Sequence, residues 1–241
     1  MSTSARTNPL KNQILAALSA EQLKRLKPVM QSVHVGLGDV LQRPNDRIRY
    51  VYFPQDGVLV SLLATMEDGK STEVGLIGDE GLLGIPAILG GETSGYSAII
   101  QAPGNCLRIK VADLKAEFNR DGALRNRLLG YVRLLLLQIS QTAACNRLHH
   151  LEQRFARWLL MVHDRVRKDE FPVTHEVLSL VLGAPRSEVS VAAASLRKEW
   201  FIRYWRGKIT ILDRQGLEKT ACECYRVVAG QPSLPRKERE P

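Results

Sequence analysis

The residues with the clearest chemical pattern lie between Thr174 and Leu212, where basic and hydroxyl side chains alternate with apolar ones. Thr174 can cap a first helix that ends near Gly183, and Pro185 suits the start of a second helix over 186–200. The buried positions of that second helix follow a 3.6-residue period: Val189, Ala192, Ala193, Leu196 and Trp200. Two β-rich runs then meet at Arg206 and Gly207 as a basic hairpin or wing. Helix, short turn and second helix is the arrangement that lays one helix in the major groove of DNA.

We expect the DNA-facing side chains to come from the start of the first helix, the outer face of the second helix and the wing. They are Thr174, His175, Arg186, Ser187, Glu188, Ser190, Val191, Ala194, Arg197, Lys198, Arg203, Arg206 and Lys208. Arg186 should contact base edges, and the wing cations should contact phosphates, which gives affinity without sequence information. Two alternatives remain: a helical hairpin that only packs, and a winged helix that binds nucleic acid without sequence preference.

The charge of the chain is concentrated in its C-terminal half. Residues 1–115 carry 12 basic and 11 acidic side chains, whereas residues 116–241 carry 22 and 14, within a total of +9. A positive C-terminal half suits a polyanion, which charge alone does not distinguish among DNA, RNA and an anionic membrane. We expect double-stranded DNA as the partner.

Composition and spacing exclude several other classes. The most apolar stretch, 128–139, is interrupted by Gly130 and Arg133, so we expect no membrane span. The N-terminus lacks an export signal, and four cysteines in 241 residues do not make a disulfide scaffold, which favours a reducing, cytoplasmic location. The five histidines are scattered, with no nucleophile–base or metal motif, so we do not expect an enzyme.

The part of the chain before Thr174 must position this segment, and its sequence pattern divides it into a β-rich region and a helical region. Short β-rich runs separated by Gly, Pro, Asn and Asp predict an all-β roll or sandwich, with strands over 33–35, 40–41, 50–53, 58–63, 73–77, 97–100 and 106–109. A long helix is expected over 123–146 with two apolar stripes, one of them Leu129, Val132, Leu136, Ile139 and Ala143. A helix with two apolar faces can pack on its own domain and on a second copy of itself, although full burial within one domain is the alternative. We expect the dimer helix to use Leu124, Leu128, Tyr131, Val132, Leu135 and Ile139.

The sequence resembles the Crp/Fnr family, the cyclic-AMP receptor and fumarate-nitrate regulators. The residues that carry the resemblance are 38–41, 52–54, 57 and 78–84 in the N-terminal half, and 174–177, 182–190, 196, 202, 206–213 and 217 in the C-terminal half. The resemblance implies an α+β fold with a cyclic-nucleotide-binding-like sensor domain (10–118), a dimerisation helix (119–147), a winged helix-turn-helix domain (148–229) and a flexible tail (230–241). It also implies a homodimeric bacterial transcription regulator that works with RNA polymerase. If the roll switches the protein, we expect the physical route to be a shift of the long helix around 124–143.

The resemblance implies an effector pocket that departs from the family's phosphate-binding pattern. Its residues would be Gly78, Glu80, Gly81, Leu82, Tyr96, Ser97 and Ala98. Tyr96 stands where the family's phosphate-binding Arg belongs, and no basic residue lies between Lys70 and Arg108. A phenol cannot supply the charged, bidentate donor that a buried phosphate needs. We therefore expect weak or absent cyclic-AMP binding, with another ligand or none in the roll.

The recognition helix departs as well. Arg186 matches the first family Arg, but Ser187 stands at a Glu position and Val191 replaces the second Arg. Such a face suits thymine methyl packing and hydroxyl contacts, so base choice should rest on Arg186 and on DNA shape.

We expect the cysteines and tryptophans to have structural roles rather than to bind a ligand. No cysteine precedes Cys106, which argues against the family's N-terminal iron–sulfur centre. Cys145 and His149 lie four apart, a spacing compatible with zinc or haem, but two ligands are too few. Cys222 and Cys224 are expected on different faces of a helix. We therefore expect no metal site and no cofactor. The three tryptophans, Trp158, Trp200 and Trp205, are expected to be core or wing anchors.

Overall fold

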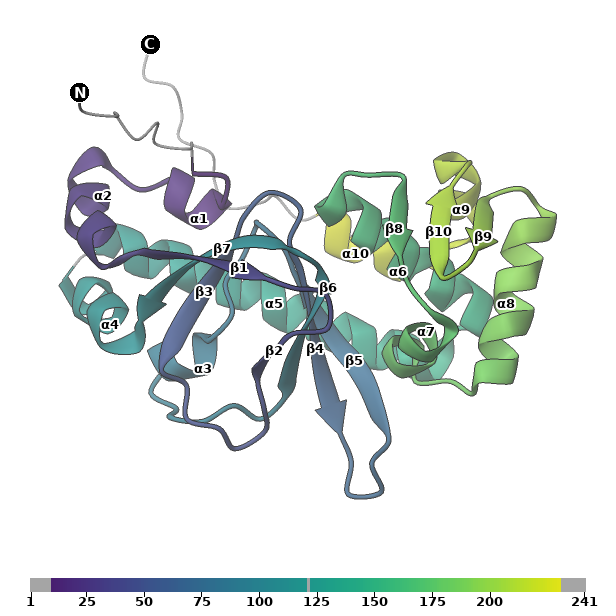
Figure 1. The fold of residues 1–241 in the computed structure, drawn as a ribbon, viewed down its shortest axis with the longest axis horizontal. Helices are drawn as coiled ribbons and strands as arrows, with labels where there is room; N and C mark the ends of the chain where they lie inside the picture. The colour runs from purple at the N-terminus through teal and green to yellow at the C-terminus, as the bar shows by residue number, and fades with distance from the viewer. Residues whose placement is uncertain (1–9, 121, 231–241) are drawn as a thin grey trace, which may run out of the picture.

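The computed structural model describes residues 10–120 and 122–230. A β-roll with short flanking helices forms one half, a winged helix forms the other, and the long helix α5 runs behind both (Figure 1). This is the α+β architecture that the sequence predicts. The tail predicted over 230–241 lies outside the described residues, apart from Gly230.

Every strand predicted for the N-terminal half is present in the β-roll. The strands are β1 (Gln31–Val35), β2 (Val40–Gln42), β3 (Tyr50–Pro54), β4 (Leu59–Thr65), β5 (Ser71–Ile77), β6 (Ser97–Ala102) and β7 (Gly104–Lys110). They form two antiparallel sheets, ordered β1-β7-β3 and β2-β6-β4-β5. Side chains such as Phe53, Leu62 and Ile100 fill the space between the sheets and are fully buried. The turn residues therefore separate the strands at the positions that the sequence predicts.

Short helices cover the roll. These are α1 (Gln13–Ala16), α2 (Ala20–Leu26), the 3-10 helix η1 (Lys27–Val29), α3 (Ile85–Ile88) and α4 (Val111–Arg120). Ser19 caps α2 through a reciprocal capping box with Gln22. The single-turn helix α3, which follows Gly84, was not predicted from the sequence.

The long helix α5 (Gly122–Leu148) starts one residue earlier and ends two residues later than predicted. One of its two apolar stripes packs into the core of the β-roll through Leu124, Leu128, Tyr131 and Leu135. These four are buried within their own protomer, so assigning them to a dimer contact was wrong. The neighbouring stripe, called the open stripe below, is only partly covered: Val132 and Ile139 pack against the same core, whereas Leu129 is 43% and Leu136 59% exposed.

Among the described residues, α5 is the one single helix whose length and hydropathy would allow it to span a membrane; α7 and α8 pass the same test only as a bent pair. The packing of α5 on the β-roll gives its apolar side chains a different role, because one stripe belongs to the core of a folded domain.

The C-terminal half is a winged helix. Its elements are α6 (Leu151–Val166), β8 (Glu170–Pro172), α7 (His175–Leu182), α8 (Arg186–Lys198), β9 (Ile202–Trp205), β10 (Lys208–Ile211), α9 (Arg214–Thr220) and α10 (Cys224–Ala229). The strands form a third sheet, ordered β8-β10-β9, of which β8 was not predicted. The prediction that α8 reaches Trp200 and buries it was wrong. Helix α8 ends at Lys198, and Trp200 takes a positive φ of 58° and is 78% exposed.

Polar contacts join the two halves. The Arg165 Nε of α6 lies 2.8 Å from Glu80 Oε1 of the β-roll, and Arg167 pairs with Asp79 at 2.7 Å. Trp158, which is buried as predicted, donates from Nε1 to Glu73 Oε1 on β5 at 3.1 Å. The sensor-like roll and the winged helix thus share a packed seam.

Candidate nucleic-acid interface

The helix-turn-helix is built by local signals on either side of a tight turn. Thr174 caps α7 by accepting from the backbone N–H of Val177 at 3.3 Å. Gly183 ends α7 in the left-handed conformation, with φ of 56°. A Cβ on Gly183 would also lie 2.7 Å from Thr72 Oγ1 on β5, so this position requires glycine for two reasons. The axes of α7 and α8 bend by 104° at this turn.

Helix α8 buries one face and exposes the other, as predicted. Val189, Ala192, Ala193 and Leu196 are buried in the core of the winged helix. The outward positions are all exposed: Arg186, Ser187, Glu188, Ser190, Val191, Ala194, Arg197 and Lys198. Val191, an apolar side chain at the centre of this face, is 72% exposed. The face therefore offers short side chains in its middle and cations at its ends.

The N-terminal end of α8 is tied to α7 by an ion pair. Arg186 Nη1 lies 2.7 Å from Glu176 Oε1, and both side chains are exposed. The backbone N–H of Glu176 and the Thr174 side chain lower the pKa of Glu176, so the carboxylate is ionised at neutral pH. The predicted contact residue His175 packs edge-on against Tyr204, with ring centroids 4.6 Å apart. It is half-buried and lies at the junction between α7 and the wing.

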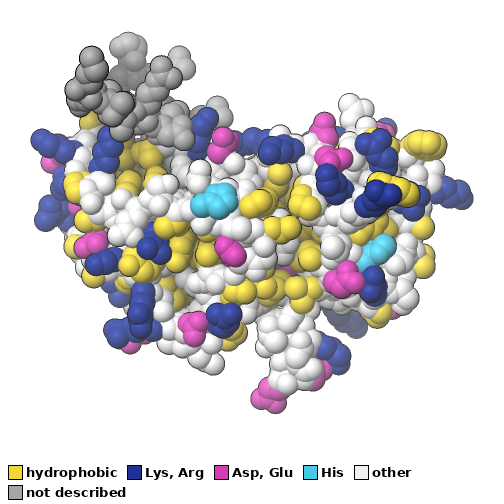
Figure 2. Space-filling view, in the orientation of Figure 1, with side chains coloured by type: hydrophobic (Ala, Val, Ile, Leu, Met, Phe, Trp, Pro, Cys, Tyr) yellow, Lys and Arg dark blue, Asp and Glu magenta, His cyan; other side chains and the backbone are white. Residues whose placement is uncertain are grey.

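The wing places its basic residues on one side of the small sheet. Arg206 and Gly207 both have positive φ, as a two-residue type I′ hairpin turn requires. Alternation along β9 and β10 turns Arg203, Trp205 and Lys208 outward and buries Ile202 and Ile209. The guanidinium of Arg206 stacks over the Trp205 ring at 5.4 Å. Figure 2 shows Lys and Arg side chains over this end of the molecule, among exposed apolar ones.

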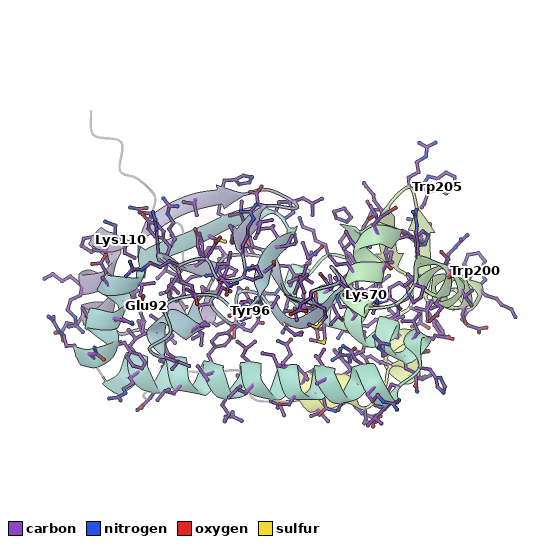
Figure 3. All side chains as sticks on the ribbon, turned by 90° about the horizontal axis from the view of Figure 1, so that it is seen from below. Lys70, Glu92, Tyr96, Lys110, Trp200 and Trp205 are labelled. Carbon is purple, nitrogen blue, oxygen red and sulfur yellow. The ribbon has the colours of Figure 1, made fainter. Side chains whose placement is uncertain are left out.

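This outward side of the wing is hollowed. The hollow is lined by Glu170, Arg203, Trp205, Arg206, Lys208 and Thr210. Lys208 Nζ is paired with Glu170 at 3.1 Å, so one acidic group partly balances the three cations. Trp205 is 66% exposed, and it points away from the β-roll at the end of the domain where Trp200 also lies (Figure 3). Trp200 and Trp205 were expected to be core or wing anchors, but both side chains are exposed. Flanking positive charge was the sequence signal that could have placed Trp205 on a binding surface.

The residues predicted for the effector pocket come together, but protein side chains fill the space around them. A Cβ on Gly81 would lie 2.3 Å from the Tyr131 ring of α5, so the ring occupies the space directly against this loop. Figure 3 shows Tyr96 between the roll and α5, and burial raises its pKa to about 12. Ala98 and Leu82 belong to the core, Ser97 begins β6, and the Gly78 N–H donates to Glu80 at 3.2 Å.

One residue of this pocket was missed by sequence reasoning. Arg165 binds Glu80 and also donates to Gln138 Oε1 at 3.3 Å and to the Met161 carbonyl at 3.0 Å. It lies in α6, more than 80 residues along the chain, so a search of the neighbouring sequence for a cation could not find it. The guanidinium is already engaged by protein groups.

The cysteine prediction rested on a wrong premise. Cys145, His149, Cys222 and Cys224 place their ligand atoms within 4.8 Å of one another, rather than offering two ligands at most. Cys222 precedes α10 and Cys224 begins it, so the two thiols converge instead of pointing to different helix faces.

Family comparisons match both halves of the chain. The family model described as a cyclic nucleotide-binding domain matches residues 32–121, and that of a Crp-like helix-turn-helix domain matches residues 153–220. The comparison with curated proteins gives no match.

Solved structures share the whole arrangement. A CRP/FNR-family transcriptional regulator from Thermus thermophilus is 25% identical, with a TM-score of 0.63, over 79% of this chain and 98% of that one. FixK2 from Bradyrhizobium japonicum is 16% identical, with a TM-score of 0.68, over 80% and 98%. The c-di-GMP-responsive regulator CLP from Xanthomonas campestris is 15% identical, with a TM-score of 0.66, over 80% and 99%. The two matched domains together cover more than half of this chain. The chain therefore belongs to the Crp/Fnr family of transcriptional regulators, which are not enzymes, and its winged helix is the family's DNA-binding domain.

Proposed function

We propose that the protein regulates transcription as a homodimer that binds a specific, two-fold symmetric DNA site. The observation that carries this proposal is the exposed face of α8, with Arg186 at its N-terminal end and the wing cations beside it. Helix N-terminal residues lie nearest the base edges when a recognition helix enters the major groove. The wing then contacts the flanking phosphates.

The open stripe of α5 supports the dimer. Its residues are spaced three and four apart, as in the seam of a coiled coil: Leu129, Val132, Leu136, Ile139 and Ala143. Figure 3 shows α5 along one edge of the molecule, with one side against the roll and the other side uncovered. A second copy of α5 would cover exposed leucines that are costly to leave in water. Pairing there would present two copies of α8, one for each half-site.

Base selection would depend on few groups. Arg186 can bind guanine through two hydrogen bonds, whereas Val191 and Ala194 suit thymine methyl groups and Ser187 and Ser190 can accept or donate single bonds. A site read in this way depends partly on the shape and stiffness of the DNA. RNA polymerase is the partner that family membership implies.

For the β-roll, we propose that cyclic AMP is not the effector. Tyr96 replaces the expected cation, Tyr131 packs against the Gly81 loop, and Arg165 is held by Glu80. An anionic phosphate buried there would need a free guanidinium or a comparable set of donors. Calorimetry with cyclic AMP should give no heat of binding; micromolar affinity would contradict this part of the proposal.

The DNA proposal is tested by selecting genomic fragments that the purified protein binds at moderate salt, followed by gel shifts on the enriched sequences. We expect a palindrome with half-sites one helical turn, about 34 Å, apart. Steep salt dependence with no enriched sequence would instead indicate a winged helix that binds nucleic acid non-specifically. A protomer that stays monomeric in sedimentation at micromolar concentration would refute the dimer.

A further inference from the structure

We propose that Cys145, His149, Cys222 and Cys224 form a tetrahedral site for a thiophilic divalent cation, with zinc as the best fit. The four ligand atoms lie within 4.8 Å of one another, and the three cysteines are buried. Three sulfurs and one imidazole nitrogen are a common ligand set for structural zinc. Neither the family models nor the proposed DNA-binding function involves these residues.

The distances are close to those of a metal site. Cys145 Sγ and Cys222 Sγ are 3.4 Å apart, and Cys224 Sγ lies 3.5 Å from His149 Nδ1. A tetrahedral zinc ion with the usual bond lengths separates two sulfurs by about 3.8 Å and a sulfur from a nitrogen by about 3.6 Å. These two pairs need adjustments of a few tenths of an ångström, and the remaining pairs, all within 4.8 Å, need to close by at most about 1 Å.

The groups around the four ligands are those expected to orient a metal site. The Nε2 of His149, the nitrogen that points away from the thiols, lies 3.3 Å from Glu223 Oε1. A carboxylate on the outer nitrogen fixes the tautomer of a metal-bound histidine and raises its basicity. Gln141 Nε2 lies 3.0 Å from Cys224 Sγ and can donate to a thiolate. These two contacts, Glu223 to His149 and Gln141 to Cys224, are of the kind that orients metal ligands.

Charge balance agrees with the same assignment. A divalent cation with three thiolates and a neutral imidazole carries one negative charge. Arg154 and Arg157 of α6 both interact electrostatically with Cys145. Arg157 is buried, hydrogen-bonds to Thr142 Oγ1 at 3.2 Å and interacts electrostatically with Glu73, but it makes no ion pair within 4.0 Å among the described residues. A buried guanidinium beside a negatively charged metal cluster has its charge compensated.

The site would fasten the junction between the dimer helix and the DNA-binding domain. Cys145 lies near the end of α5, and His149 lies in the two-residue link before α6. Cys222 and Cys224 come from the last segment of the winged helix, 77 residues beyond Cys145 in the case of Cys222. One ion would thus fix the angle at which α5 carries α8. This consequence for DNA binding rests on the proposed function, whereas the metal site does not.

The test uses the full chain, purified under reducing conditions without chelators, and then stripped and titrated with Co²⁺. We expect one equivalent of zinc per protomer as isolated. Co²⁺ should give the visible bands of a tetrahedral ion and a thiolate charge-transfer band, both removed by Zn²⁺. Cys224→Ser and His149→Ala should lose these bands, and Cys106→Ser, a buried cysteine in the β-roll, should keep them. His149→Cys should restore a four-sulfur site with a shifted spectrum, which separates ligand loss from misfolding.

Glu223→Gln should weaken Co²⁺ affinity by about 10-fold, with the spectrum retained. Four reactive thiols with no Co²⁺ bands in the folded wild type would overturn the proposal. So would a Cys145–Cys222 disulfide in protein isolated from cells, or equal metal content in Cys224→Ser. None of these readouts depends on DNA, so the metal site can fail while the DNA-binding proposal stands.

Discussion

Arg186 and Glu176 form an ion pair across the turn of the helix-turn-helix, with 2.7 Å between Nη1 and Oε1. The pair holds the arginine over the first turn of α7 rather than extended from α8. Because both side chains are exposed, the pair contributes little to stability and can be exchanged for a contact with DNA. The free protein therefore holds Arg186, the side chain that we propose reads bases, against Glu176.

Replacing Arg186 and Arg206 separately should divide specificity from affinity. Arg186→Ala should cost about 1–3 kcal/mol on the preferred site and little on other sites, because it removes a base contact. Arg206→Ala should weaken binding evenly and reduce the salt dependence, because it removes a phosphate contact. Gel shifts over a salt series on matched and scrambled sites measure both effects. Equal loss of discrimination in the two variants would contradict this division.

Releasing Arg186 should strengthen DNA binding. Glu176→Gln removes the carboxylate that competes with DNA for the guanidinium and also a negative charge near the phosphates. We expect affinity for the preferred site to rise several-fold, which is about 1 kcal/mol. Glu199→Gln, an exposed substitution beyond the end of α8, is the matched control. Unchanged affinity in Glu176→Gln would mean that the pair does not limit binding.

A charge in the open stripe of α5 should prevent pairing. Leu136→Glu is expected to raise the dimer dissociation constant by about 100-fold or more, because burying an unpaired charge costs several kcal/mol. The protomer should keep its fold, since Leu136 is exposed and the buried stripe is untouched. Analytical ultracentrifugation measures the effect, with the exposed Asn126→Glu on the same helix as a control. A Leu136→Glu protein that remains dimeric would place the interface elsewhere.

The seam between the two halves should depend on pH through Glu73. Burial raises the pKa of Glu73 to about 7, although Ser61 and Trp158 donate hydrogen bonds to it. The folded state then holds a proton that the unfolded state releases near its ordinary pKa, so stability falls as pH rises from about 4.5 to above 7. We expect a loss of about 3 kcal/mol over that range. Urea unfolding of Glu73→Gln should show a flatter pH profile, and exposed Glu67→Gln should follow the wild type. A wild-type profile with no slope would argue against a protonated Glu73.

Local patterns predicted much of this structure. Turn residues and β-rich runs placed the β-roll strands, and the helical period of Val189, Ala192 and Leu196 placed the exposed face of α8. These features could be predicted because each depends on neighbours within a few residues. The end of α8 was misjudged because Trp200 fits the apolar period although its backbone has already left the helix.

The remaining features depend on contacts between distant segments. Arg165 reaches Glu80 from α6, and Cys222 and Cys224 reach Cys145 across the fold. The two stripes of α5 were recognised, but their periodicity could not tell which stripe the β-roll would cover. Tertiary packing decided that, by placing Tyr131 against Gly81.

The Glu80–Arg165 ion pair gives the loop around Gly78 and Gly81 a second role, as a contact with α6. This loop is where the roll would receive a small molecule, and it is also an attachment point for the DNA-reading half. A compound that captured Glu80, or offered Arg165 a better anion, would break this ion pair and leave the Arg167–Asp79 and Trp158–Glu73 contacts in place. Binding at this loop would then weaken the contact between the roll and α6 directly, at one of the polar contacts that join the two halves.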